Sequence, residues 1–194
     1  MTKNRLEAFS DGVIAILITI MVLELKVPRG TELAALRPAL PAFLAYILSF
    51  IVLAIYWNNH HHMLHATHHV TGGVLWANAH LLFWLSLIPF TTAWMGENEF
   101  APLPEAAYGA VLLLAAVAYT ILQTTIIANH GMAPEVAEAL RRDVKGKVSL
   151  VLYAAAVPLA FVHRAIAGAI FVVVALMWLV PDRRIERALQ RPSG

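Results

Sequence analysis

The stretch RLEAFSDGVIAILITIMVLEL, residues 5–25, reads as a membrane-spanning helix with a carboxylate near its start. Residues 12–25 alone would rise about 21 Å, which is short of a hydrocarbon core of about 30 Å. A start at Asn4 gives about 33 Å. Asn4 and Glu7 also have the spacing of a capping box, with asparagine in the cap position. We therefore predict that the helix begins at Asn4 and that Asp11 lies two turns inside it.

Composition indicates that the rest of the chain is also a membrane protein. Of its 194 residues, 60% are hydrophobic and 13% are charged, about half the charged fraction of a soluble domain. Mean hydropathy is +0.70. The absence of cysteine excludes disulfides and thiolate chemistry. Asp11 interrupts the first apolar run, so we do not expect a cleaved signal peptide.

Six apolar segments are candidates for membrane spans, which need roughly 20 mostly apolar residues. They cover residues 4–25, 40–63, 73–95, 105–128, 146–162 and 165–180. We predict an all-α polytopic membrane protein, with one six-helix domain over residues 1–194 and both termini on one side. Pro89, Pro158 and Pro181 are expected to kink or end their helices. Residues 133–147 read as a short amphipathic helix on the inner side.

The distribution of basic residues predicts the orientation. With the termini inside, the inner segments hold Lys3, Arg5, Arg141, Arg142, Lys145, Lys147, Arg183, Arg184, Arg187 and Arg191, whereas the outer loops hold Lys26, Arg29, Arg37 and Arg164. Because basic residues gather on the cytoplasmic side, both termini are expected in the cytoplasm and the chain in the inner (plasma) membrane. This pattern suits membrane topology better than a nucleic-acid surface.

The first segment has two different faces. Ile16, Ile20 and Leu23 share one face, with Thr19 at its edge. Asp11 lies about 140° from Ile16 around the helix, so it is expected to face neighbouring helices, where a buried charge needs a partner. The available cations are an arginine near the helix start and the histidines after the second segment. By periodicity alone, ordinary helix packing explains the aliphatic stripe better than a special function.

A histidine cluster follows the second segment. The run WNNHHHMLHATHHV, residues 57–70, holds six of the nine histidines. His61/His65 and His65/His69 are i, i+4 pairs, a spacing that can hold Zn²⁺ or Ni²⁺. No acidic residue or cysteine lies within the run, so we favour a wet, pH-responsive helix end over a metal site. His80, inside the third segment, is expected to hydrogen-bond to another helix.

Motifs of other function classes are missing from the sequence. It has no TVGYG filter, P-loop, nucleophile elbow or HExxH motif. Because acidic and nucleophilic residues are sparse in the spans, we expect neither an enzyme nor a cofactor. A proton- or metal-coupled transporter, with Asp11 and the histidine cluster as relay groups, is an alternative. A membrane subunit that only binds partners is another.

Three stretches carry a resemblance to a known family. RLEAFSDGVIAILIT resembles the signature of the transmembrane protein 175 family of potassium channels, whose R-x-x-x-F-S-D core is carried here by Arg5, Phe9, Ser10 and Asp11. IYWNNHHHML is similar to the Y-W-x-N-H-H stretch of the family, and LWANAHLLFWLSLIPFTTAWMGE resembles its third helix. The last three helices resemble the family mainly by length and hydropathy. His62 is a departure, because many relatives carry arginine there.

The resemblance implies a homotetramer in the lipid bilayer, with a central pore that passes K⁺ and other monovalent cations with modest selectivity. The first helix would line this pore. Carried over by position, the constriction rings are Ile16, Ile20 and Leu23, with Thr19 as a hydroxyl layer. Glu24, just beyond Leu23, would raise the cation concentration at the outer mouth.

The resemblance also implies a polar network that braces the first helix from behind. The motif and bracing residues are Arg5, Phe9, Ser10, Asp11, His60 and His61. We assign the bracing histidine to His60, with His61 as the second choice. In this interpretation Asp11 is a structural brace behind the pore wall and not an ion ligand.

Overall fold

The regular structure of the described residues is helical. The structure is a computed structural model that describes residues 2–129, 134, 137–138 and 143–179. In chain order its helices are α1 (Lys3–Leu23), the 3-10 helix η1 (Leu33–Ala39), α2 (Leu40–His65), α3 (Gly72–Ser86), α4 (Ile88–Glu97), α5 (Pro102–Ala128), α7 (Val144–Val162) and α8 (Arg164–Leu179). The predicted all-α fold is confirmed. Pro181 lies outside the described residues, as do residues 133, 135–136 and 139–142 of the amphipathic helix predicted over 133–147. The last four residues of that prediction belong to α7.

Five helical stretches are long and apolar enough to cross a bilayer. They are Lys3–Leu23, Leu33–His65, Gly72–Glu97, Pro102–Ala128 and Val144–Val162. These stretches coincide with the first five predicted spans. The sixth prediction, residues 165–180, coincides with α8, whose 16 described residues are fewer than the roughly 20 that a span needs.

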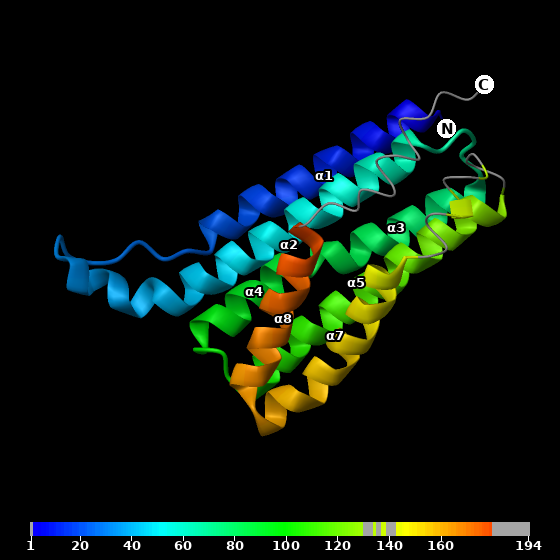
Figure 1. The fold of residues 1–194 in the computed structure, drawn as a ribbon. Coiled ribbons are helices and arrows are strands. Elements are labelled where there is room, and N and C mark those ends of the chain that lie inside the picture. The colour runs from blue at the N-terminus through cyan, green and yellow to red at the C-terminus, as the bar shows by residue number, and fades with distance from the viewer. Residues whose placement is uncertain (1, 130–133, 135–136, 139–142, 180–194) are drawn as a thin grey trace.

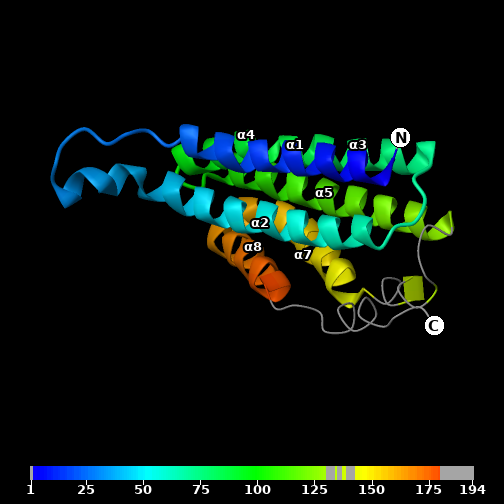
Figure 2. The same ribbon diagram turned by 90° about the horizontal axis from the view of Figure 1, so that it is seen from above.

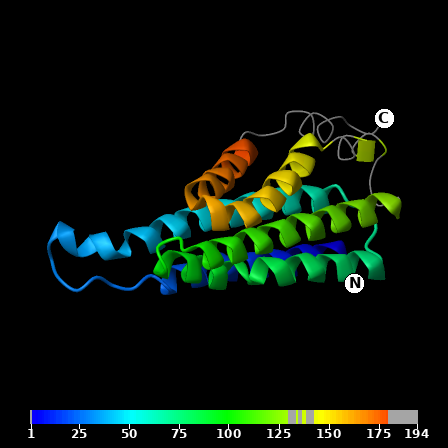
Figure 3. The ribbon, with the colours of Figure 1, turned by 90° about the horizontal axis from the view of Figure 1, so that it is seen from below.

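The helices pack around α5. This helix contacts α3, α4, α7 and α8 and lies in the middle of the bundle (Figure 2). On one flank, α1 packs against α2, α3 and α4, running beside α2 for most of its length (Figure 1). On the other flank, α7 and α8 form a V-shaped hairpin (Figure 3). The connection from α1 to α2 projects beyond the remaining helices (Figures 1 and 2). The pore-lining candidate α1 therefore lies at one edge of the helical bundle formed by a single chain.

Large apolar side chains and close backbone contacts hold the bundle together. Ile14 of α1, Leu53 of α2 and Phe171 of α8 are all fully buried. Helices α2 and α4 approach closely at Gly96, where an added Cβ would lie 2.6 Å from the Cα atom of Ala42. Small residues at helix crossings allow such backbone contact inside a membrane protein.

The prolines differ in their effect on the helices. α3 ends at Ser86 and α4 begins at Ile88 with Pro89 in its first turn, a position where proline removes no intrahelical hydrogen bond. The predicted break at Pro89 is confirmed. Pro158, by contrast, lies inside α7, which continues to Val162, so this proline does not end its helix.

The predicted start of the first helix is wrong by one residue. α1 begins at Lys3, and Thr2 occupies the cap position without a side-chain hydrogen bond to the helix. Asn4 therefore lies inside the first turn, where its side chain cannot cap the helix start, and the predicted capping box with Glu7 does not form. The length argument holds, because Asp11 does lie two turns inside α1.

Candidate pore face and the polar contacts behind it

One face of α1 packs into the bundle. Its buried residues recur every three or four positions and are Leu6, Ser10, Ile14, Leu17 and Met21. This spacing places them on one side of a helix. Apart from Ser10 the face is apolar, and it packs against α2, α3 and α4. The contact fixes which side of α1 is turned away from its own chain.

The predicted constriction residues lie on the side of α1 that is turned away. Ile16 is 56% exposed, Ile20 39% and Leu23 79%. Thr19 is also exposed, and its hydroxyl donates a hydrogen bond to the carbonyl of Ile16 at 2.9 Å. The oxygen lone pairs of Thr19 are thus directed outward from an apolar strip. Phe9, from the motif, is exposed nearer the N-terminus of the same helix.

A buried chain of hydrogen bonds joins α1, α3 and α2. Ser10 Oγ donates to the carbonyl of Leu6 at 2.9 Å and accepts from Asn78 Nδ2 at 3.0 Å. The other amide atom, Asn78 Oδ1, lies 2.6 Å from His60 Nε2. Because the amide nitrogen donates to Ser10, the amide oxygen is the acceptor for an N–H of His60. His60 Nδ1 is buried and has no partner among the described residues.

Asp11 makes a separate contact. The indole Nε1 of Trp57 donates to Asp11 Oδ1 at 3.0 Å. This bond joins α1 to α2 about one turn before His60 in α2. The structure therefore divides the predicted bracing network in two, with Asp11 on Trp57 and His60 on Asn78. Arg5 is exposed and, in the described chain, contacts neither. It lies eleven residues before Ile16 and so on nearly the same side of the helix.

Stacked rings continue the α1–α2 contact toward the N-terminus of α1 and the C-terminus of α2. The ring of His61 stacks between those of Trp57 and His65, with centroids 6.0 and 6.1 Å away. Lys3 Nζ donates to the backbone carbonyl of His65. These i, i+4 histidines face one another ring to ring. In the described part of the chain, no three His, Cys, Asp or Glu side chains are grouped as a metal site would require.

The C-terminal end of α1 carries charged groups. Glu24 follows the last residue of the helix, in the C-cap position, and it is exposed. Glu97, at the end of α4, forms an ion pair with Lys26 at 2.7 Å. An exposed pair of this kind is screened by solvent, but it places a cation beside Glu97. Glu24 is therefore the better placed carboxylate next to Leu23.

His80 and Asn78 lie on the same helix but bond differently from what the sequence analysis expected. His80 accepts a hydrogen bond from Trp84 Nε1 at 2.9 Å, one turn along its own helix. The expected bond from His80 to another helix is wrong for the described chain: His80 is exposed, and its partner Trp84 is the i+4 neighbour on the same face of its own helix. Asn78, which does bond between helices, was the more informative signal: a lone amide in an apolar span needs partners.

The comparisons with known proteins agree with this architecture. The family model described as endosomal/lysosomal potassium channel TMEM175 matches residues 5–89. A potassium channel of Chryseobacterium sp. (strain P1-3) is 53% identical over 190 residues, which cover 98% of this chain and 99% of that protein. A potassium channel of Streptomyces collinus (strain DSM 40733 / Tue 365) is 34% identical over 128 residues, or 62% of each chain.

A solved structure is also similar. The crystal structure of a lysosomal potassium-selective channel TMEM175 homolog from Chamaesiphon minutus has a TM-score of 0.79 and 27% sequence identity to this chain. The match covers 91% of this chain and 96% of that one, so the likeness extends to α5, α7 and α8. The chain therefore belongs to the TMEM175 family of potassium channels.

Proposed function

We propose that four copies of this chain surround a central potassium pore lined by α1. The observation that carries the proposal is the two-sidedness of this helix. Its inward face is packed against the bundle, whereas Ile16, Ile20 and Leu23 are left exposed on the other side. An apolar strip with one hydroxyl layer is a suitable wall for a narrow pore on a symmetry axis.

The pore would work through hydrophobic constriction. Rings of Ile16, Ile20 and Leu23 exclude water when they are close together, and a small outward movement of α1 admits a partly hydrated cation. K⁺ loses its hydration water more easily than Na⁺, so the constriction favours K⁺. Selectivity is modest, because Thr19 hydroxyls replace only part of the hydration shell. No cofactor enters this mechanism, and K⁺ is the permeant ion.

The contacts behind α1 would hold the pore wall in place. The Ser10–Asn78–His60 chain and the Asp11–Trp57 bond attach α1 to two different helices. Asp11 is then a positioning residue and not an ion ligand. Arg5 lies on the exposed side of α1, so any bracing contact that it makes would be to another copy of the chain.

The channel would sit in the plasma membrane as a single six-helix domain per copy. The bias of basic residues toward inner segments supports cytoplasmic termini. In that orientation Glu24 faces outward and raises the local concentration of cations at the mouth.

Ion flux in liposomes tests the proposal. Purified protein is reconstituted with K⁺ inside and Na⁺ outside, and the reversal potential is measured. We expect a conductance that reverses toward the K⁺ equilibrium potential. A flux that saturates and follows a pH gradient would instead support a coupled transporter that uses Asp11 and the histidine cluster. Absence of any flux would support a partner-binding subunit.

A further inference from the structure

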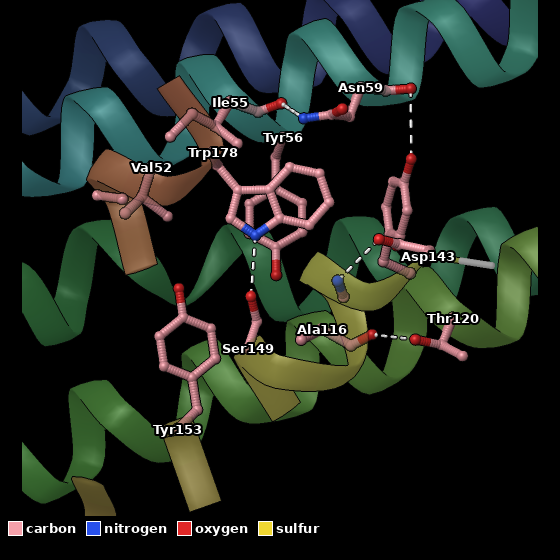
Figure 4. Close-up of a pocket in the computed structure, with 13 residues that line it drawn as sticks. Val52, Ile55, Tyr56, Asn59, Ala116, Thr120, Asp143, Ser149, Tyr153 and Trp178 are labelled. Atoms are coloured by element: carbon pink, nitrogen blue, oxygen red, sulfur yellow. Dashed lines mark hydrogen bonds between the residues drawn. The ribbon is translucent and has the colours of Figure 1, made fainter. Parts of the chain in front are cut away.

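The α7–α8 hairpin meets α5 differently at the two ends of its V. At the open end, Trp178 Nε1 donates to Ser149 Oγ at 2.9 Å, beside a cavity of about 50 Å³ between α2, α5, α7 and α8 (Figure 4). At the closed end, a turn at His163 joins α7 to α8 (Figure 3). Because the cavity interrupts the packing at the open end, the attachment of α8 to α5 depends on contacts toward the closed end.

Toward the closed end, α5 and α8 pack tightly. An added Cβ at Gly109 of α5 would lie 2.9 Å from Phe171 Cζ of α8. The rings of Tyr108 and Phe171 meet edge to face, with their centroids 5.3 Å apart. Ala167, one turn before Phe171 on α8, is also fully buried. One turn before Gly109, the same side of α5 carries Glu105, so this apolar contact continues directly into a carboxyl group.

Glu105 is buried where α5 meets α8. Its side chain lies in the first turn of α5, yet the residue is only 1% exposed. Its Oε1 atom lies beside Gly168 of α8, where an added Cβ would be 3.2 Å away. Its Oε2 atom is buried and has no hydrogen-bond partner among the described residues. Because a buried charge without a partner is far more costly than a buried neutral group, this arrangement suits a carboxyl group that carries a proton.

Two opposing influences act on this carboxyl group. The titratable side chains at this end of α4, α5, α7 and α8 are Glu97, Glu99, Tyr108, His163 and Arg164. Arg164, the first residue of α8, interacts electrostatically with Glu105 and donates to the carbonyl of Glu99 at 3.4 Å. A cation and the start of a helix both favour a negative charge on Glu105, whereas burial and the unpartnered oxygen oppose it. The balance makes the charge of Glu105 sensitive to pH.

We propose that Glu105 is a proton-binding site that controls the attachment of α8 to α5. With the proton bound, the carboxyl group is neutral and fits the buried contact beside Gly168. When the pH rises and the proton is lost, a charge is left inside the contact and the hairpin loosens at its closed end. The folded chain thus retains a proton that the unfolded chain releases at lower pH, so stability falls as pH rises. The residues of this contact belong to α5 and α8, so the site is separate from the candidate pore face.

Thermal unfolding of the full-length protein in detergent, from about pH 5.5 to about pH 8.5, tests this site. The variant Glu105→Gln keeps the shape of the protonated side chain and cannot ionise. We expect the unaltered protein to melt with Glu105→Gln at the acid end and about 3 °C or more below it at the alkaline end. Glu32→Gln is the matched control, since Glu32 is exposed and its variant should follow the unaltered chain at every pH.

Two further measurements separate proton binding from a purely structural role of Glu105. Arg164→Gln removes the cation that favours the charged form, so the fall in melting temperature should move to higher pH. Arg164→Lys keeps that charge and should leave the fall in place. Hydrogen exchange in the first turns of α8 is compared between the unaltered protein and Glu105→Gln at the same pH. It should be faster in the unaltered protein at the alkaline end and equal at the acid end.

Three results would overturn the proposal. Coinciding melting profiles of the unaltered protein and Glu105→Gln would show that no proton is exchanged at this site. A constant loss of stability in Glu105→Gln at every pH would identify a permanently charged Glu105 paired with Arg164. A melting temperature that rises with K⁺ at constant ionic strength, in the unaltered protein and not in Glu105→Gln, would identify a cation site. These measurements do not use ion flux, so they succeed or fail independently of the proposed pore.

Discussion

The carboxylate near the start of α1 is bonded to an indole and not to a cation. Asp11 is partly buried, and Trp57 supplies one N–H at 3.0 Å. This contact satisfies the carboxylate without bringing a second charge into the membrane, where burial of ions is costly. The aromatic ring of Trp57 also extends the stack with His61. A single side chain thereby joins the polar and the apolar parts of the α1–α2 contact.

At the pore face, we predict that Ile16→Asn raises the leak current of the closed channel. A side-chain amide in the constriction forms hydrogen bonds to water, so the ring of residue 16 side chains no longer excludes water when the channel is closed. The preference for K⁺ over Na⁺ should fall by about threefold or more, equivalent to a fraction of one kcal/mol. Reversal potentials in liposomes measure it. Val22→Asn is the control, since Val22 is exposed on the same helix but about a third of a turn away. Unchanged currents in Ile16→Asn would remove this residue from the pore.

Behind the pore face, we predict that Asn78→Leu destabilises the protein. It leaves Ser10 and His60 buried without their shared partner, which should lower the free energy of unfolding by about 1–3 kcal/mol. Thermal unfolding in detergent measures the loss, and Ser10→Ala added to Asn78→Leu should cost little more because the bond is already gone. Asn98→Leu is the control, since Asn98 is exposed. Fully additive losses would contradict the hydrogen-bond chain.

These contacts show which part of the site could be predicted from sequence. Periodicity within α1 placed Asp11 on a different side from Ile16, and Asp11 is partly buried whereas Ile16 is exposed. Periodicity alone favoured ordinary packing for the Ile16 stripe, which is exposed on the single chain. The partners of Ser10 and Asp11 lie 68 and 46 residues away in the chain. Spacing within one helix carries no information about contacts at such separations, so Asn78 and Trp57 were not assigned.

At the scale of helices, length and composition were sufficient to place the first five spans, but not their ends. α1 starts one residue before Asn4. Lys3 at this end donates a hydrogen bond to the carbonyl of His65 in the last turn of α2, a contact between helices that a local capping pattern does not include. The break before Pro89 was predictable because proline has a strong local effect. Pro158 has the same chemistry, yet α7 continues past it, held by its packing against α5 and α8.

For the α2–α4 crossing, we predict that Gly96→Ala lowers stability by at least about 1–3 kcal/mol, because overpacking at a tight contact forces a backbone shift. The added Cβ would lie 2.6 Å from the Cα atom of Ala42. Thermal unfolding measures the effect. Gly72→Ala provides the control, since a Cβ there meets nothing within 4 Å. Equal melting temperatures for the two variants would show that the crossing is looser than described.

At the scale of the whole molecule, the absence of cysteine makes cross-linking a clean test of assembly. We predict that Leu23→Cys forms a disulfide between copies under mild oxidation, because the proposed pore would bring the copies of Leu23 around its symmetry axis to the short Cα separation that a disulfide needs. Denaturing gels would show a dimer band. Val151→Cys, which is exposed on α7, should stay monomeric on the gel. The reverse pattern would place α7, and not α1, between copies.

The projecting connection between α1 and α2 also offers a practical handle. Val27 is 88% exposed, and Gly30 has a φ of +123°, so this segment is a turn with little packing. Exposed loop tips tolerate insertions well, and a short epitope placed after Gly30 should leave the helices intact. Antibody added to unbroken cells would bind that epitope only if the loop faces the outside. Immunolabelling of this projecting loop would thus report on which side of the membrane it lies.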